Sequence, residues 1–348
     1  MIHMAQAGYD VHLIAPQDTS FELLPLISWH KWFLKPQSHN PLFEIISFFH
    51  LLILLLLLRP SLVFSYTVKA NFYCSLMGKI LGFKTYSIVT GLGRVFTIPS
   101  PLYRFAKRII LWGLQLNTQI WVMNHFDFRY LKSLTRKLRI DHMPGEGVDA
   151  LRFSPLQERM SGEITHFLFI GRLLKTKGLE ELFQAVKSLR QKGHSIHLKI
   201  AGIYDPNDLD TINKTQMEEL IKQGLVEHLG YVEDVRFLIQ QSDCLVLPSY
   251  REGLPRVLLE ANAMQCPTIV THVPGCKDIV KEGVNGFLCP PRCSKSLERA
   301  LQKFMALSEK EKEKLGINGR KMILQNFTTH HVQKFYIQTL KNGGFLRS

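Results

Sequence analysis

The residues with the greatest potential for chemistry lie where an expected strand is followed by an expected helix. The apolar run Cys244–Leu247 is typical of a buried strand, and Pro255 favours the first turn of a helix. Gly253 and Leu254 would then lie at a helix N-terminus, where unpaired N–H groups and the positive end of the helix dipole favour an anion. The pattern therefore predicts an anion site in this loop.

Two carboxylates frame the same loop, Glu252 before the helix and Glu260 two turns inside it. A carboxylate beside an anion site must bind something other than the anion, and sugar hydroxyls can donate hydrogen bonds to carboxylates. A site for a diphosphate, a ribose and a second sugar is a nucleotide-sugar site. The alternative is a structural strand–turn–helix unit with two surface glutamates, and this pair alone does not decide between the two.

Two cations follow another expected strand, His166–Ile170. Gly171 and Arg172 come directly after this strand, and Lys177 lies five residues beyond Arg172. Arginine suits bidentate contact with phosphate oxygens, and lysine acts as a point charge, so a loop with both can hold a diphosphate from two sides. The alternative is two solvated basic residues.

The sequence around these residues resembles the family-4 retaining glycosyltransferases. The two carboxylates, with seven residues between them, match the family's E-x7-E signature, and the flanking segments match in the same order. The resemblance covers roughly the whole chain and is strongest from about residue 140 to residue 330. The matching segments are Pro248-Ser249, Glu252-Gly253-Leu254-Pro255, Glu260-Ala261, Pro267-Thr268-Ile269-Val270, Pro274-Gly275-Cys276-Lys277-Asp278-Ile279-Val280 and Asn285-Gly286-Phe287-Leu288.

The resemblance implies the GT-B fold, an α/β fold in which two doubly wound Rossmann-like domains face each other across a cleft. It implies that Glu252 is catalytic and contacts the donor sugar, that Glu260 binds the ribose, and that Arg172 and Lys177 bind the diphosphate. The backbone near Val232 would meet the base. The predicted donor-binding residues are Gly171, Arg172, Lys177, Val232, Glu252, Gly253, Leu254, Pro255 and Glu260.

The resemblance also implies a reaction that needs no metal and no other cofactor. Two cations and a helix N-terminus would stabilise the charge that builds on the departing diphosphate, and no acidic pair with metal-ligand spacing is visible. Members of the family retain the anomeric configuration, usually drawn as front-face attack assisted by the departing phosphate. No enzyme nucleophile is therefore predicted.

Two glycines follow the expected strand Lys84–Val89. Gly91 and Gly93 would let the backbone approach a phosphate or an acceptor closely, although an ordinary strand-to-helix turn could also contain them. The subgroup of the family that acts on polyprenyl-diphosphate-linked sugars has a similar Gly-Leu-Gly at this point. This similarity implies a polyprenyl-diphosphate-linked saccharide as the acceptor.

The composition fits two globular domains. The chain has 348 residues, of which 46% are hydrophobic and 21% charged, and its net charge is +14, with 16 Lys/Arg against 8 Asp/Glu in residues 1–155. The six cysteines lack paired metal-ligand spacing and are expected to be thiols in a reducing cytosol. No cleavable signal peptide is apparent. We expect a cytoplasmic protein that is peripheral on the inner face of the cytoplasmic membrane.

Three segments of the first half indicate an anionic membrane surface as a partner. Ile45–Leu58 is apolar over 14 residues, fewer than the about 20 that a span needs, so we expect a helix whose outer face contacts lipid. Tyr103–Leu116 and Phe126–Ile140 are expected to be basic helices that lie on anionic headgroups, or else solvated faces. One cationic stripe would contain Arg129, Lys132, Arg136 and Arg139.

We expect three parts in the chain: an acceptor- and membrane-facing domain over residues 1–155, a nucleotide-sugar-binding domain over 156–328, and a C-terminal helix over 329–348 that packs back on the first domain. A Rossmann-like domain should open with a strand and a glycine-containing turn. This chain opens with a helical segment and the strand Val11–Ala15, so the first strand is expected to be missing.

The predicted function is the transfer of a hexose, for example an N-acetylhexosamine, from a UDP-sugar to a lipid-carrier-linked glycan. The product would belong to surface polysaccharide or glycoprotein glycan biosynthesis. A nucleotide-sugar epimerase of the same fold and an inactive sugar-nucleotide-binding remnant remain as alternatives. A nucleic-acid binder would explain the net charge, but it leaves the two glutamates unexplained and the chain has no recognised nucleic-acid module. No nucleic-acid partner is expected.

Overall fold

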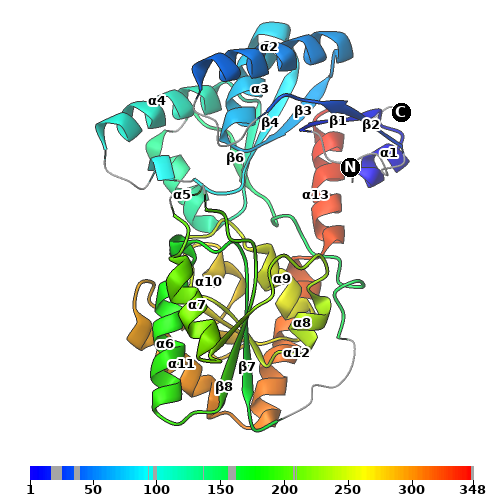
Figure 1. The fold of residues 1–348 in the computed structure, drawn as a ribbon. Coiled ribbons are helices and arrows are strands. Elements are labelled where there is room, and N and C mark those ends of the chain that lie inside the picture. Colours follow the sequence, from blue (N-terminus) through cyan, green and yellow to red (C-terminus); the bar gives the residue numbers. More distant parts are fainter. Residues whose placement is uncertain are drawn as a thin grey trace. The chain divides into compact units, whose positions relative to one another are not determined.

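The computed structural model describes residues 1–16, 26–34, 40–92, 94–96, 100–135, 137–155, 162–206, 208 and 210–345. The chain forms two compact units, each built on parallel strands connected by helices (Figure 1). Unit 1 comprises Met1–Val122, Asp127–Met143 and Gln333–Ser348, and unit 2 comprises Met123–Phe126 and Pro144–Val332. The predicted fold class, two Rossmann-like α/β domains, is confirmed.

Unit 2 contains a six-stranded parallel sheet with the strand order β12-β11-β10-β7-β8-β9. The chain runs outward from β7 to β9 and then returns to β10, which pairs with the other side of β7. The direction of the strand order therefore reverses between β7 and β10. The strands are β7 (Thr165–Ile170), β8 (Ile196–Ala201), β9 (Val226–His228), β10 (Cys244–Leu247), β11 (Thr268–Thr271) and β12 (Gly286–Cys289).

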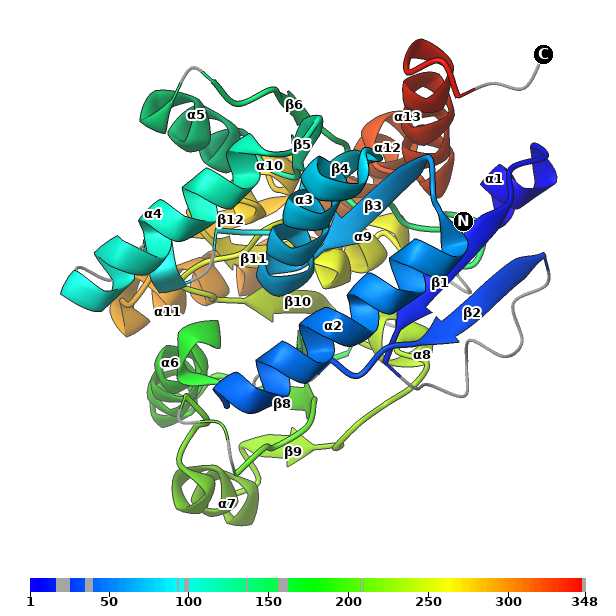
Figure 2. The same ribbon diagram turned by 90° about the horizontal axis from the view of Figure 1, so that it is seen from above.

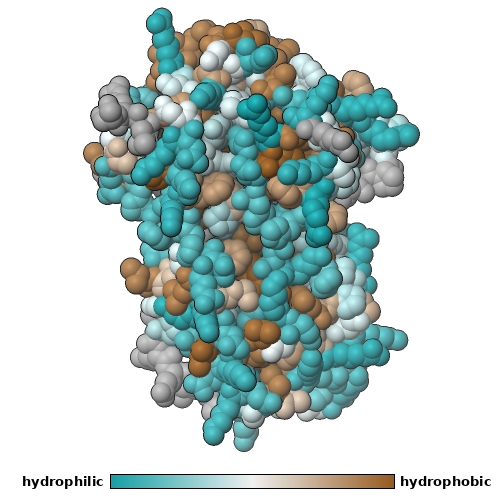
Figure 3. All heavy atoms as spheres, turned by 180° about the vertical axis from the view of Figure 1, so that it is seen from behind, coloured by the Kyte–Doolittle hydropathy of each residue, from teal (hydrophilic) through white to brown (hydrophobic). Residues whose placement is uncertain are grey.

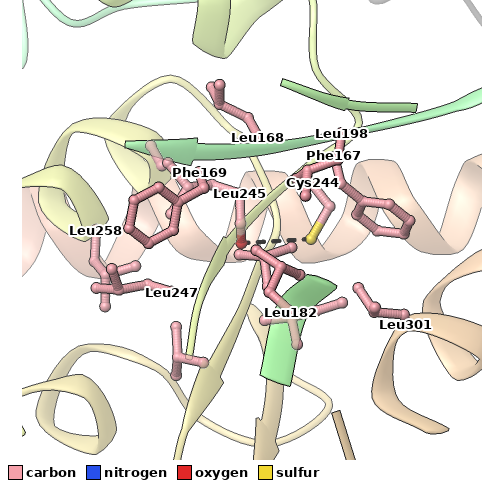
Figure 4. Packing of buried hydrophobic residues seen from close by; sticks show 14 of the residues in the cluster. Phe167, Leu168, Phe169, Leu182, Leu198, Cys244, Leu245, Leu247, Leu258 and Leu301 are labelled. Carbon is pink, nitrogen blue, oxygen red and sulfur yellow. Dashed lines mark hydrogen bonds between the residues drawn. The ribbon is translucent and has the colours of Figure 1, made fainter. Parts of the chain in front are cut away.

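Helices cover both faces of this sheet. On one face α6 (Leu179–Gln191) packs with α11 (Ser294–Met305), and on the other α9 (Arg256–Ala263) packs with α12 (Glu309–Asn326) (Figures 1 and 2). Apolar side chains of the strands fill the space between the layers, and Figure 4 shows Phe167, Phe169, Leu245 and Leu247 among them. The shorter helices are η3 (Lys175–Lys177), α7 (Lys214–Lys222), α8 (Arg236–Gln240) and α10 (Cys276–Ile279).

Unit 1 contains a four-stranded parallel sheet, in the order β3-β4-β5-β6, and a separate parallel pair, β1-β2. The helices α2, α3 and α4 lie side by side (Figure 2). The strands are β1 (Val11–Ala15), β2 (Ile27–Lys31), β3 (Leu62–Tyr66), β4 (Lys84–Val89), β5 (Gln119–Val122) and β6 (Ile140–His142). The helices are α1 (Ile2–Gln6), α2 (Pro41–Leu58), α3 (Val68–Leu81), η2 (Arg94–Phe96), α4 (Pro101–Gln115) and α5 (His125–Leu134).

The apolar helix α2 is 18 residues long and begins four residues before the predicted start. Pro41 fits the first helical position, and the Oδ1 atom of Asn40 accepts a hydrogen bond from the amide of Leu42 at 3.0 Å. By length and composition it is the one helix among the described residues that could cross a membrane. One side is buried in unit 1, through Leu51 and Leu55.

The predicted basic helix over 126–140 is wrong in its second half. Helix α5 ends at Leu134, and Ile140 pairs with Ile120 as the first residue of β6. Pairing with β5 buries Ile140 in the sheet, so the backbone must leave the helix before it. Arg139 is therefore not on the helix that carries Arg129 and Lys132, Arg136 lies outside the described residues, and the predicted four-residue stripe does not form.

The chain passes between the two units near the predicted domain boundaries. Residues 144–155 lie in unit 2 rather than in the first domain, and Val148 is bonded there to Phe327 and Thr329. Most of α13 (Thr329–Asn342) lies in unit 1, from Gln333 onward. There the ring of Tyr336 lies 5.0 Å from the rings of both Phe64 and Trp121.

Candidate functional site

Two loops of unit 2 leave the sheet at the same edge, where the strand order reverses. β7 leads into the loop 171–177 and β10 into the loop 248–255. Because β7 and β10 are neighbouring parallel strands, their carboxyl ends lie together. Ligands of open α/β sheets bind at such a reversal point. The structure therefore places the predicted residues Arg172, Lys177 and Glu252 on neighbouring loops.

Glu252 and Lys177 form an ion pair between these loops. The distance from Glu252 Oε1 to Lys177 Nζ is 2.6 Å, and the two side chains are 11% and 23% exposed. The loops are also joined by a hydrogen bond from the Tyr250 amide to the Thr176 carbonyl at 2.9 Å. An ion pair that is partly shielded from water is stronger than one on the open surface. The structure thus brings two of the predicted site residues into direct contact.

Gly178 allows the two loops to approach closely. Its φ is +72°, and a Cβ atom at this position would lie 2.1 Å from the carbonyl oxygen of Pro248. The turn before it is anchored by Asp210, whose carbonyl accepts from the Lys175 amide at 2.7 Å and whose carboxylate accepts from the Thr176 hydroxyl. These contacts fix the backbone from which Lys177 extends.

Arg172 is not part of the Lys177–Glu252 pair. Its side chain is 65% exposed and lies 3.7 Å from Asp208. Gly171, which precedes it, continues the sheet by donating its amide hydrogen to Ala201 at 3.0 Å. Val232 lies in the loop after β9, two strands away from β7. The structure therefore does not bring these residues into contact with the ion pair.

The N-terminus of α9 begins where the sequence predicts it. Pro255 is the N-cap residue and makes no side-chain cap, so first-turn amide groups are left for other partners. The preceding carbonyl of Gly253 accepts from Asn124 Nδ2 at 3.1 Å, and a Cβ atom on Gly275 would lie 2.3 Å from the same carbonyl oxygen. A Cβ atom on Gly145 would meet the side chain of Leu254. The loop that contains Gly253 and Leu254 is thus packed closely against Asn124, Gly275 and Gly145.

Glu260 is buried at 8% exposure, and its Oε1 atom accepts from Arg256 Nε at 2.9 Å. Burial raises the pKa of the Glu260 carboxyl, and the opposing effect of Arg256 is smaller. Since Glu252 is also largely buried, the alternative of two surface glutamates is wrong.

Cys276 lies in the same region and is fully buried. Burial raises the pKa of the Cys276 thiol well above its usual value, and the charge of Glu252 raises it further. The thiol is therefore neutral at physiological pH. Among the described residues, no group of three or more His, Cys, Asp or Glu side chains could hold a metal ion.

Two residues that hold the site, Asn124 and Asp210, were not predicted as site residues. Asn124 is a polar residue two positions after the strand β5, and it is fully buried. That pattern could have identified it, since a polar side chain directly after a buried strand often lies at a ligand-binding edge. Asp210 gives no comparable signal in the sequence.

Together these residues provide a cation, a helix N-terminus and two carboxylates, of which Glu252 lies on the loop after β10 and the buried Glu260 lies in the helix that follows it. The cation and the amide groups suit an anion, and the carboxylates suit hydroxyl donors. Residues 157–322 match the family described as "Glycosyl transferases group 1".

Curated relatives agree with this match. A capsular polysaccharide biosynthesis glycosyltransferase, CapM of Staphylococcus aureus, is 29% identical over 46% of this chain and 42% of its own length. The N,N'-diacetylbacillosaminyl-diphospho-undecaprenol alpha-1,3-N-acetylgalactosaminyltransferase of Campylobacter jejuni is 24% identical over 88% of this chain and 84% of its own. The chain spans about half the length of several other curated relatives that it matches.

Solved structures show the same fold. The sucrose-phosphate synthase of Thermosynechococcus elongatus has a TM-score of 0.84 at 19% identity, covering 97% of this chain and 90% of its own. Anabaena Alr3699/HepE, solved in complex with UDP, has a TM-score of 0.77 at 16% identity, covering 98% and 96%. The predicted enzyme class, a glycosyltransferase, is confirmed at this level. The chain has the GT-B fold, and its residues 157–322 are similar to the glycosyl transferases group 1 family.

Proposed function

We propose that this protein is a retaining, family-4 glycosyltransferase that moves a sugar from a UDP-sugar to a polyprenyl-diphosphate-linked saccharide. The product would serve surface polysaccharide or glycoprotein glycan biosynthesis. The observation that carries the proposal is the Lys177–Glu252 pair at the reversal point of the unit 2 sheet. The names of two Campylobacter jejuni relatives, which contain undecaprenol-linked acceptors, support the choice of acceptor.

The donor would occupy the edge formed by the loops after β7 and β10. Arg172, Lys177 and the first-turn amides of α9 would bind the diphosphate and stabilise the charge that develops on it during transfer. Lys177 would then leave Glu252, whose carboxylate becomes available to a hydroxyl of the donor sugar. Glu260 would bind the ribose, and the backbone near Val232 the base. No enzyme nucleophile, metal or cofactor is part of the proposal.

Transfer would be tested with a panel of UDP-sugars and a membrane lipid extract. We expect UDP release together with a glycosylated lipid product. Glu252→Gln and Arg172→Ala should each lower the rate at least about a hundredfold, since each removes a charged contact to the donor. Lys303→Ala, which removes a cation paired with Glu282 elsewhere in unit 2, is the control and should leave the rate unchanged. A full rate in either site variant would refute the site.

Product analysis separates the two alternatives. A nucleotide-sugar epimerase would return an epimer still attached to the nucleotide, whereas transfer frees UDP. Binding of UDP without either reaction, across the full panel, would identify an inactive sugar-nucleotide-binding remnant.

The outer face of α2 supports a membrane surface as a partner, and we propose that this surface is the anionic, cytoplasmic face of the membrane. Apolar residues gather over α2 in Figure 3, and their exposure runs from 49% to 76%. On helix α4, which packs on the α3 helix beside α2, Phe105, Ile109 and Trp112 are also exposed, beside the exposed Arg104 and Arg108. Apolar and cationic side chains together suit an interfacial helix. The exposed α2 residues are Leu42, Ile45, Ile46, Phe49, Ile53, Leu56 and Leu57.

Liposome flotation would test the membrane contact. The double variant Ile53→Ser with Leu57→Ser should lower the bound fraction more than tenfold, because burying each large apolar side chain contributes about 1.5–3 kcal/mol. Leu151→Ser changes an apolar residue of unit 2 that is 90% exposed and is the control. Equal binding by the double variant would rule out this face.

A further inference from the structure

Unit 1 contains a pocket of about 180 Å³ at the carboxyl end of β4. Apolar side chains from α3, β4 and α4 form most of its wall, and Gly91, one of the two glycines predicted to approach a ligand, lies in its lining. Pockets that hold a whole ligand measure about 300–1,000 Å³. This pocket therefore fits one substituent of a larger molecule. The apolar wall includes Phe72, Ile88, Val89, Leu92, Ile110 and Leu114.

Asn71 lines this pocket and has a hydrogen-bond acceptor without a partner. The residue is 4% exposed, and its Nδ2 atom donates to the Ile88 carbonyl at 3.0 Å. That bond fixes the orientation of the amide, because a flipped amide would place two oxygen atoms against each other. The Oδ1 atom is buried and accepts from no group among the described residues. Buried polar atoms are normally paired, so the missing partner is an N–H or O–H donor.

The N-terminus of α3 contributes to the same pocket. Thr67, the N-cap residue, and Val68, the first residue of the helix, both line it. The Thr67 side chain makes no cap hydrogen bond. N–H groups of a first helical turn have no partner within the helix. The pocket therefore combines an acceptor, helix-end donors and apolar walls.

We propose that this pocket receives the acetamido group of an acceptor sugar. The acetamido N–H would donate to Asn71 Oδ1, its carbonyl would accept from the first turn of α3, and its methyl group would pack on the apolar wall. A hydroxyl group offers no methyl group to the wall. A hydrocarbon chain or an ionised phosphate would leave Asn71 unpaired, since neither has a hydrogen-bond donor. The inference rests on the proposed function, because it assigns part of the proposed acceptor to unit 1.

Two synthetic probes would test the assignment, short-chain prenyl diphosphates that carry either N-acetylglucosamine or glucose. Their Kd values would be measured by calorimetry with UDP present. We expect the wild type to bind the acetamido probe at least about tenfold more tightly, since a site built to hydrogen-bond a ligand group rejects the analogue without it. Asn71→Leu should remove this preference by weakening the acetamido probe alone.

A matched control separates recognition from folding. Asn117 is also in unit 1 and is not among the residues that line the pocket; its Oδ1 atom accepts from the Ser87 hydroxyl and its Nδ2 atom donates to the Leu114 carbonyl. Asn117→Leu should keep the preference. If Asn71→Leu weakened the binding of both probes equally, the role of Asn71 would be only to connect α3 to β4. That result would overturn the inference. If Asn71→Leu does not fold, Asn71→Ala, which adds no bulk, is measured in the same way.

Binding of UDP alone distinguishes a failure of the pocket assignment from a failure of the proposed function. If UDP binds and depends on Lys177, but the wild type binds both probes equally or neither, the pocket assignment is wrong and the proposed function stands. If UDP does not bind, the proposed function fails. The pocket assignment then stands only if the wild type still prefers the acetamido probe and Asn71→Leu abolishes that preference.

Discussion

The carboxylate of Glu260 illustrates a conflict between burial and ligand binding at a single residue. Burial raises its pKa above the usual value, so the folded protein disfavours the ionised form relative to the unfolded chain. At a pH above both the folded and the unfolded pKa, this difference lowers the free energy of unfolding. The penalty disappears as the pH falls through the folded pKa to the unfolded value of about 4.5. A role in hydroxyl binding would explain why a carboxylate occupies this position.

Glu260→Gln should therefore keep or raise the Tm at pH 7 while weakening the binding of a UDP-sugar at least about fivefold. The amide can still accept from Arg256, and it avoids the desolvation of a charge. The Tm difference between variant and wild type should vanish as the pH approaches 4.5. Thermal unfolding across this pH range checks the prediction, and a variant that is much less stable at pH 7 would contradict it.

The Lys177–Glu252 pair predicts opposite effects of its two members on nucleotide binding. Lys177 is paired with Glu252 at 2.6 Å, so the diphosphate of the proposed function would have to replace that carboxylate. Lys177→Ala should weaken UDP binding at least about tenfold. Glu252→Gln should leave it equal or tighter, because UDP carries no donor sugar. Calorimetry with UDP alone measures both effects. Weaker UDP binding by Glu252→Gln would contradict the proposal that the diphosphate replaces Glu252 at Lys177.

Sequence patterns singled out two charged residues that the structure brings into contact, but not the residues that hold their loops in place. Lys177 and Glu252 could be predicted because cations and carboxylates follow buried strands at short, recognisable spacings. Asn124 acts on Gly253, which lies 129 positions away in the chain, and Asp210 acts on a turn 34 positions away. No local pattern encodes such contacts, since they exist only after the sheet has formed.

At the scale of elements, two glycines with similar backbone angles have different roles. Gly178 has a φ of +72° and lies against Pro248, whereas Gly193 has a φ of +85° and open space around it. An alanine at either position meets the left-handed backbone penalty, about 1 kcal/mol. Only at Gly178 does it also push two loops apart.

Gly193→Ala should therefore lower the Tm by a few degrees and leave UDP binding unchanged. Gly178→Ala should lower the Tm further and weaken UDP binding at least about tenfold, because the shift displaces the turn that contains Lys177. Thermal unfolding and calorimetry on both variants test this. Equal UDP affinity in the two would show that the close approach of the loops does not position the lysine.

Most strands could be predicted to within one or two residues, because parallel strands that are buried on both faces are continuous apolar runs. The errors fell where tertiary pairing or capping overrides that signal. α5 ends early because β6 must pair with β5, and α2 starts early because Asn40 and Pro41 form a cap outside the apolar run. β2 (Ile27–Lys31) was not predicted, since its alternating polar residues give no apolar run.

At the scale of the whole molecule, the C-terminal helix completes the core of unit 1. Tyr336 is 9% exposed and packs on Phe64 and Trp121, which belong to strands more than 200 residues earlier in the chain. The stability of unit 1 therefore depends on a segment that lies far from its strands in the sequence.

Tyr336→Ala should destabilise unit 1 by about 3 kcal/mol, in line with other large aromatic residues removed from a core. Hydrogen exchange should show faster exchange in β3 and β5, while the strands of unit 2 keep their protection. Phe237→Ala, at a residue of unit 2 that is 63% exposed, is the control and should change neither. Uniform loss of protection in both units would contradict the assignment of α13.

The chain passes between the two units four times, at residues 122–123, 126–127, 143–144 and 332–333. The transfer of donor specificity from one such enzyme to another would therefore require the exchange of several separate stretches of sequence. A single-crossover hybrid that joins two parents in the middle would inherit a C-terminal helix fitted to the wrong partner. Recombination libraries of these enzymes should accordingly give more folded members when the last helix is inherited with the first unit.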